Sequence, residues 1–192
     1  MTARNIIPLA LLGSTALALV MPTTTHAAGF VEDAKVTLGL RNFYINRNFV
    51  DPAFPQGKAE EWTQSMILDA RSGFTQGTVG FGLDALAMGA IKLDGGRGTR
   101  NTGLLPVHDE GRPAYSYGRL ALAGKAKLSK TELKVGEWMA VLPILRSDDG
   151  RSLPQTFQGA QLTSNEIAGL TLYGGQFRQN SERNNASMED MS

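Results

Sequence analysis

Cysteine is absent from the 192 residues, which excludes a secreted fold stapled by disulfides, so stability has to come from elsewhere. A strong charge bias is absent too, since the formal net charge is +1. This near-neutral balance excludes a strongly basic nucleic-acid binder. Proline is scarce, with 8 residues against 22 glycines, a balance that is ordinary for strands joined by turns. Beyond the N-terminal region, no apolar run is long enough for a membrane-spanning helix. If this chain lies in a membrane, it does so as strands.

An export signal occupies the N-terminus. Met1–Arg4 carries positive charge, Ile6–Pro22 is apolar, and Thr25–Ala28 offers small residues for a signal peptidase. The apolar run is shorter than the roughly 20 residues that a spanning helix needs, and its last proline closes it, so an uncleaved anchor is the weaker interpretation. We therefore expect residues 1–27 to be a cleaved signal peptide and residues 28–192 to be the mature chain.

Histidine is nearly absent from the mature chain. His26 is lost with the signal, so that only His108 remains. A single loop histidine cannot complete a Ser-His-Asp set, and no second histidine is available to form a metal site with Asp109 and Glu110. We expect no catalytic residues, no metal and no cofactor.

Apolar and polar residues alternate in seven segments of the mature chain. In the clearest of them, Val79–Ala87, the odd-numbered positions are all apolar, and Gly80, Gly82 and Asp84 fall between them. Side chains alternate between the two faces of a strand, so each segment presents one apolar wall and one polar wall. The predicted strands are Lys35–Arg47, Trp62–Arg71, Val79–Ala87, Gly118–Lys127, Thr131–Glu137, Ala160–Ser164 and Leu170–Arg178.

Connections between these strands alternate between short and long. An outer-membrane barrel has short turns at one rim and longer loops at the other, outside the cell. A soluble β-sandwich also has alternating strands, but it seldom combines strands of about ten residues with this rhythm. We therefore predict an all-β fold, an antiparallel transmembrane β-barrel of which about seven strands are present. The short turns are Ser72–Gly77, Ser129-Lys130 and Glu166–Gly169, and the long loops are Asn48–Glu60, Ile91–Ala114 and Met139–Gln158.

One stretch is specific enough to suggest a family. Leu142–Leu162 reads LPILRSDDGRSLPQTFQGAQL and resembles the inward-folded third loop of the OprD family of outer-membrane porins. The resemblance covers essentially all of the mature chain. Further stretches that agree with the family are Gly29–Phe49, Ala59–Leu86, Gly103–Arg112, Ser129–Met139 and Leu162–Gln179.

The resemblance implies a substrate-selective channel in the bacterial outer membrane. Such channels allow passive diffusion of small solutes such as basic amino acids, peptides and other carboxylate-bearing compounds. The expected partners are therefore outer-membrane lipid and these solutes, with no nucleic acid, and association of several copies stays open. Members of the family are more than twice as long as this chain, and a barrel has to close because an unpaired strand edge in lipid costs several kcal/mol. We therefore expect the N-terminal, less-than-half-length portion of such a porin.

Five basic residues fall on the polar parity of their predicted strands. A charge that faces lipid at mid-depth costs about 2–4 kcal/mol, so this parity predicts a position in the lumen. There, the residues would draw an anionic group inward through a positive field. The alternative is an ordinary polar wall whose lysines reach the interface near strand ends. The five residues are Arg41, Arg71, Arg119, Lys125 and Lys134.

Four charged residues crowd into the stretch that resembles the constriction loop. They are Arg146, Asp148, Asp149 and Arg151. Opposed charges across a narrow pore would orient a zwitterionic solute. The alternative is a solvated turn, because an Asp-Gly dipeptide is a strong turn signal.

Two further interpretations belong to other classes of protein. The chain could be a truncated porin remnant that does not conduct. It could also be a soluble exported β-domain that binds a ligand. Channel recordings separate the first from a pore, and solubility without detergent identifies the second.

Overall fold

The computed structural model describes residues 29–51, 53, 55–94 and 100–191, so the expected signal peptide lies outside the described residues. Within them, β-strands are the regular elements, and no helix has the length and apolar character needed to cross a membrane. The strands are β1 (Lys35–Asn48), β2 (Lys58–Arg71), β3 (Val79–Lys92), β4 (Ser116–Leu128), β5 (Thr131–Trp138), β6 (Thr156–Ser164), β7 (Leu172–Ser181) and β8 (Glu189–Asp190).

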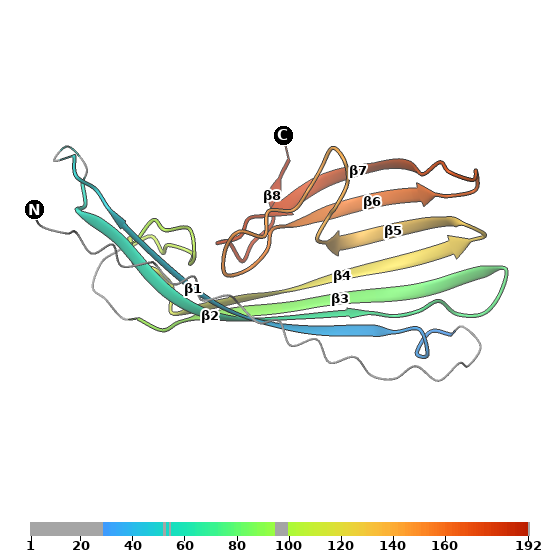
Figure 1. Cartoon of the computed structure of the whole chain (residues 1–192), viewed down its shortest axis with the longest axis horizontal. Coiled ribbons are helices and arrows are strands. Elements are labelled where there is room, and N and C mark those ends of the chain that lie inside the picture. Colours follow the sequence, from blue (N-terminus) through green and yellow to red (C-terminus); the bar gives the residue numbers. More distant parts are fainter. Residues whose placement is uncertain (1–28, 52, 54, 95–99, 192) are drawn as a thin grey trace, which may run out of the picture.

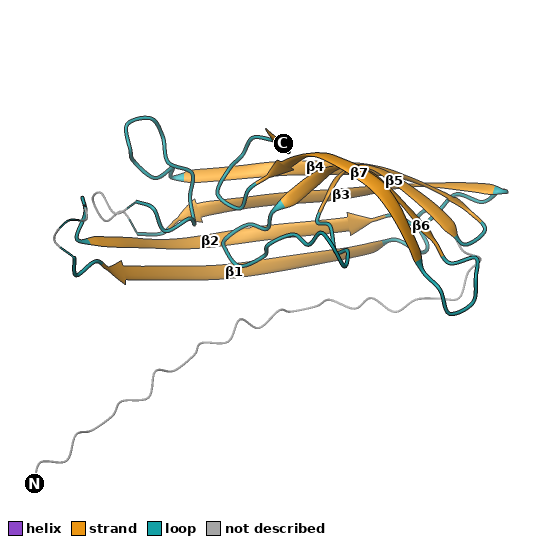
Figure 2. Ribbon diagram, turned by 90° about the horizontal axis from the view of Figure 1, so that it is seen from above, coloured by secondary structure: helices purple, strands orange, loops and turns teal. Residues whose placement is uncertain are grey.

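All eight strands form one antiparallel sheet in the order of the sequence, from β1 to β8. Figure 1 shows that the sheet curves, with β1–β4 along its lower part and β6–β8 along its upper part. Figure 2 shows the same strands running side by side from above. The order places β1 and β8 at its two ends, so the described residues form an open arc of a barrel wall.

The seven predicted strands are all present, and the prediction of an antiparallel all-β fold is confirmed. Three of them begin at the predicted residue: β1 at Lys35, β3 at Val79 and β5 at Thr131. The eighth strand has two residues and was not predicted. The start of β5 follows a tight connection from β4 in which Ser129 adopts a left-handed φ of 53°.

The predicted boundaries were wrong at the ends that border the long loops. β2 begins at Lys58 inside the predicted loop Asn48–Glu60, β3 runs to Lys92, and β6 begins at Thr156. The alternation of apolar and polar residues does not mark these strand ends. Inward-facing residues there are covered by other segments of the chain, so they do not have to be polar. On β2, for example, Ala59 and Glu61 are 0% and 1% exposed.

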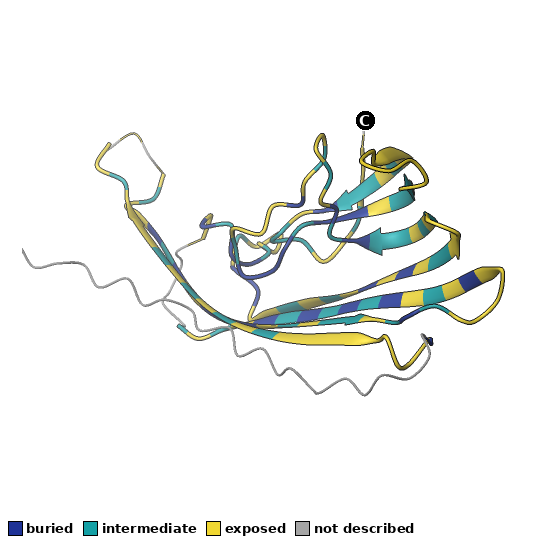
Figure 3. Ribbon diagram, turned by 45° about the vertical axis from the view of Figure 1, so that its right-hand side comes forward, coloured by how far each residue is buried: buried dark blue, intermediate teal, exposed yellow. Residues whose placement is uncertain are grey.

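One face of the sheet is apolar and exposed. Across the strands, Leu38, Leu68, Ala87 and Leu120 occupy one row of that face. Leu38 and Leu120 are 48% and 61% exposed. Figure 3 shows the alternating bands of buried and exposed residues along the strands. An apolar surface of this extent is unfavourable in water, and it is the surface that a barrel presents to lipid.

The opposite face carries the core. Leu86, Met88, Ala90 and Ala121 on β3 and β4 form a buried apolar cluster together with Leu153, which belongs to the connection between β5 and β6. A strand wall alone could not bury these side chains. The core therefore lies between the wall and a connection that folds onto it.

Candidate constriction and inner wall

The connection between β5 and β6, residues 139–155, is called the inner loop below. Its Leu153 is 0% exposed and packs into the apolar cluster of β3 and β4. Burying a leucine side chain fully contributes about 1.5–3 kcal/mol. The inner loop is therefore held against the inner wall by apolar packing, and its polar contacts act in addition.

The residue before the buried leucine joins the inner loop to β2. The hydroxyl oxygens of Ser152 and Thr63 lie 2.5 Å apart, and Ser65 Oγ donates to the carbonyl oxygen of Ser152 at 2.7 Å. Thr63, Ser65 and Ser152 are all nearly inaccessible to solvent. Each buried hydrogen bond contributes about 1 kcal/mol, and breaking one side leaves a costly unpaired group.

Arg41 on β1 holds one end of the docked segment. Its Nη1 lies 2.8 Å from Asp149 Oδ1 and donates to the carbonyl oxygen of Arg151 at 2.5 Å. Its Nη2 donates to Asp149 Oδ2 at 3.1 Å. A guanidinium with both ends engaged by a carboxylate and a carbonyl has little donor capacity left for a passing solute.

Arg119 on β4 holds the other end. Its Nη2 donates to the carbonyl oxygen of Pro154 at 2.5 Å. Its Nη1 donates to the hydroxyl of Ser181 and to the carbonyl oxygen of Glu182, the latter at 3.1 Å. Arg119 thus connects the inner loop with the end of β7.

Lys125 and Lys134 share one carboxylate. Their Nζ atoms lie 2.7 Å and 2.6 Å from the two oxygens of Asp84 on β3. Arg71 is paired with Asp69 on its own strand, with Nη2–Oδ2 at 2.7 Å. The five predicted basic residues therefore share one face of the sheet, and each has partners within the protein.

The four charged residues of the inner loop do not form one cluster. Asp149 is held by Arg41, as described above, whereas Asp148 pairs with Arg183 at 2.6 Å between Nη1 and Oδ2. Arg151 Nη1 donates to the carbonyl oxygen of Gly150, and Arg146 is exposed. The opposed charges expected across a pore are thus paired between the inner loop and neighbouring parts of the chain.

Sequence reasoning missed three residues of this region. Asp84 follows the same parity as the lysines that it holds, so strand alternation could have identified it. Leu153 is one of several apolar residues in the inner loop, and nothing in the sequence distinguishes it from the exposed Ile144. Arg183 lies after the last predicted strand, where no periodic pattern indicates its contact with Asp148.

A second connection also covers the inner wall. Leu104 and Leu105, between β3 and β4, are 0% and 1% exposed. Thr102 Oγ1 donates to the carboxylate of Glu61, and Tyr117 Oη donates to the carbonyl oxygen of Leu104 at 3.0 Å. Two inward-folded connections therefore narrow the space in front of β2–β4.

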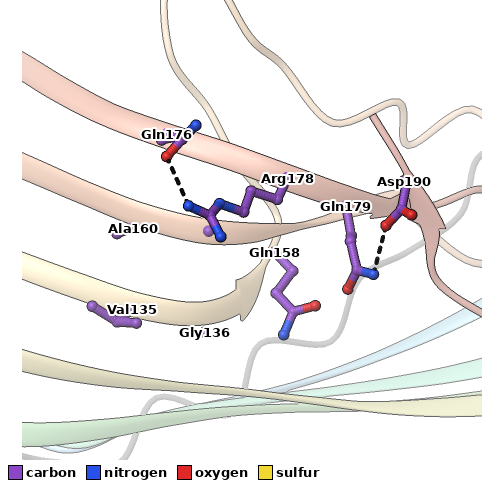
Figure 4. A pocket seen from close by; sticks show the side chains of 9 residues that line it. Val135, Gly136, Gln158, Ala160, Gln176, Arg178, Gln179 and Asp190 are labelled. Atoms are coloured by element: carbon purple, nitrogen blue, oxygen red, sulfur yellow. Dashed lines mark hydrogen bonds between the residues drawn. The ribbon is translucent and has the colours of Figure 1, made fainter. Parts of the chain in front are cut away.

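Two hollows mark the two faces of the wall. One of about 250 Å³ lies on the inner face and is lined by Asp69, Arg71, Asp84 and Lys134 among others. The other, of about 460 Å³, lies over β5–β7 and is drawn in Figure 4. Val135, Ala160 and Gln176 line it and share one outward row of the register, and Gln158, Arg178 and Asp190 make the rest of its lining largely polar.

In the part of the chain that the structure describes, no group of three or more histidine, cysteine or carboxylate side chains could hold a metal ion.

Comparison with known proteins places this geometry in context. The family model described as outer membrane porin, OprD family, matches residues 28–192. The chain is 65% identical to the porin-like protein GalP of Pseudomonas putida over 192 residues, which are 100% of this chain and 46% of that protein. It therefore spans less than half the length of this curated relative.

Solved structures agree with the fold. A BenF-like porin from Pseudomonas fluorescens Pf-5 superimposes with a TM-score of 0.82 at 71% identity, over 85% of this chain and 42% of that one. OccK2 (OpdF) of Pseudomonas aeruginosa, solved in complex with glucuronate, gives a TM-score of 0.70 at 63% identity, over 85% and 38%. The predicted barrel class is confirmed by these matches.

Proposed function

Since the chain belongs to the OprD family of outer-membrane porins, we propose that it forms part of a substrate-selective channel for passive diffusion of small solutes. The proteins of this family lie in the outer membrane of Gram-negative bacteria and are porins, not enzymes. The solute class that we propose is small carboxylate-bearing compounds, including basic amino acids and peptides.

The observation that carries this proposal is the inner loop docked on a polar wall whose other face is apolar. A loop that fills part of the lumen restricts the passage to small solutes, and charged groups beside it select among them. The glucuronate complex of OccK2 supports a carboxylate as the recognised group.

We assign the constriction to Arg146, Asp148, Asp149 and Arg151, and the basic lumen wall to Arg41, Arg71, Arg119, Lys125 and Lys134. The two sets differ in what they offer to a solute. The side chain of Arg146 is exposed, while the guanidinium of Arg119 is occupied by carbonyl groups.

Planar-bilayer recordings test the channel directly. The protein, expressed from its own gene and purified from outer membranes, is expected to give steady single-channel steps in KCl. Sodium glucuronate or arginine hydrochloride on one side should then shift the zero-current potential in the sense of solute permeation. Inserted protein without steps would favour the non-conducting remnant, and protein that stays soluble without detergent would favour a ligand-binding β-domain.

We also propose that residues 1–27 are removed as a signal peptide and that the remainder enters the outer membrane. N-terminal sequencing of the purified protein is expected to begin at Ala28. A sequence that begins at Met1 would contradict this proposal. Cross-linking in intact outer membranes tests whether several copies associate.

A further inference from the structure

Three charged side chains meet on the inner wall below the inner loop. Lys134 Nζ on β5 donates a hydrogen bond to Asp84 Oδ2 on β3 at 2.6 Å. Lys125 Nζ on β4 lies 2.7 Å from Asp84 Oδ1 but outside the direction of a hydrogen bond, and it donates instead to the carbonyl oxygen of Ser72 at 2.7 Å. One carboxylate therefore faces two ammonium groups, one through a hydrogen bond and one through an ion pair.

The three side chains are fixed in place. The side chains of Asp84, Lys125 and Lys134 are 10%, 8% and 17% exposed. Lys125 Nζ lies 5.0 Å from the ring centroid of Phe74, and Lys134 Nζ lies 5.3 Å from that of Trp138. Because these charges are largely desolvated and held, they interact more strongly than an exposed surface pair would.

A glycine makes this arrangement sterically feasible. Gly82 lies opposite Lys125 in the register of β3 and β4. A Cβ at Gly82 would lie 2.5 Å from Lys125 Cε and 2.7 Å from the carbonyl oxygen of Gly73. The missing side chain leaves the space through which Lys125 reaches Asp84.

We propose that Asp84 is a selectivity-determining residue of the lumen, because it neutralises one of the two lysine charges beside the inner hollow. This inference rests on the proposed channel function and refines it. The basic wall then exerts a weaker pull on small anions than its lysines alone would suggest. Anion selectivity at this depth is set by the balance of one carboxylate against two ammonium groups.

The expected effect follows from one unit charge. Asp84→Asn keeps the shape of the side chain and leaves one more uncompensated positive charge beside the hollow of about 250 Å³. One charge that acts over about 6 Å through a largely aqueous dielectric changes the local anion concentration by about threefold to tenfold. The variant should therefore conduct anions in larger proportion.

The measurement is the reversal potential in a KCl gradient, recorded with the protein expressed from its own gene. Asp84→Asn is expected to raise the chloride-to-potassium permeability ratio by about threefold or more. The matched control is Glu166→Gln, which removes one carboxylate from the turn after β6, outside the lining of this hollow. The ratio should therefore change by less than about twofold.

A double variant separates charge from deformation of the wall. Asp84→Asn with Lys134→Met restores the original net charge, and its permeability ratio is expected to return to within about twofold of that of the unmodified protein. Asp84→Glu keeps the carboxylate and should leave the ratio unchanged. Heat-modifiable migration on gels verifies that each variant is folded.

The inference is overturned if folded Asp84→Asn conducts with an unchanged ratio, or if its ratio equals that of Glu166→Gln. It is also overturned if the double variant stays as altered as Asp84→Asn alone. Unmodified protein that inserts without channel steps would count against the proposed function instead. The two failures are therefore distinguishable in the same apparatus.

Discussion

Replacing Leu153 with alanine tests whether apolar packing holds the inner loop on the wall. Leu153 is 0% exposed and lies among Leu86, Met88, Ala90 and Ala121. A buried leucine that is truncated to alanine costs about 2–5 kcal/mol, because the removed atoms leave a cavity that the neighbours fill only in part. The inner loop pairs with no strand, so this cost should fall on loop docking and leave the sheet intact.

The expected loss of docking free energy can be compared with the free energy that the remaining contacts of the inner loop contribute. A loss of about 3 kcal/mol shifts the ratio of docked to undocked loop about 100-fold, since 1.4 kcal/mol corresponds to a factor of ten. The polar contacts of Arg41, Arg119 and Ser152 stay available, and each contributes about 1–3 kcal/mol. We therefore expect Leu153→Ala to keep the loop mostly docked but to release it often enough to be detected.

Two assays detect the release. Single-channel traces of the variant should show added brief openings to a larger conductance, and amide hydrogen exchange should accelerate in residues 150–155. The matched control is Ile144→Ala in the same loop, where the side chain is 95% exposed and the change should stay within about 0.5 kcal/mol. Leu153→Ala with unchanged exchange and unchanged current would refute the reasoning that packing holds the loop.

Three further predictions concern the lipid face, a turn and the constriction. Leu122→Arg places a charge on the apolar face and should lower the free energy of unfolding in vesicles by about 2–4 kcal/mol in urea titrations, whereas Thr163→Arg on the inner face should change it far less. The pKa of Glu166, in the turn after β6, is lowered by hydrogen bonds from the Lys130 amide and the Ser129 hydroxyl. A lowered pKa stabilises the folded state above the ordinary glutamate pKa, and this contribution is lost as the pH falls through the folded pKa. Glu166→Gln should therefore lower the protection factors of amides in the neighbouring turn at pH 7, and these factors should no longer fall as the pH drops through the carboxyl titration. Asp148→Ala combined with Arg151→Ala should alter the uptake of basic amino acids without unfolding the protein, and unchanged uptake would contradict the assignment.

Strand positions could be predicted because lipid on one side enforces alternation. Phe81 and Leu83 have to be apolar, whereas Gly82 between them and Asp84 after them face the other side and are released from that demand. The period of two therefore survives in β1, β3 and β4, where nothing covers the outer face. It fails at Ala59, an apolar residue on the inward parity of β2 that is 0% exposed, so the start of β2 was not visible in the sequence.

The shared face of the basic residues could also be predicted from the sequence, but their pairing could not. Arg41 and Asp149 are separated by more than 100 residues, and only the folded loop brings them to 2.8 Å. Strand alternation gives the face on which Arg119 lies and carries no information about the carbonyl groups that it binds. The difference between a solute-guiding cation and a loop-holding cation therefore depends on long-range contacts.

The measurement that tests the central claim most directly is site-directed spin labelling of the folded protein in lipid vesicles, which the absence of cysteine allows without removing native thiols. Labels at Phe81→Cys and Leu120→Cys are expected to collide with oxygen dissolved in the bilayer and not with a water-soluble nickel chelate. Labels at Arg71→Cys and Lys127→Cys should show the reverse preference. Chelate accessibility at Phe81 and Leu120, together with oxygen accessibility at Arg71 and Lys127, would contradict a wall with lipid on one face and water on the other.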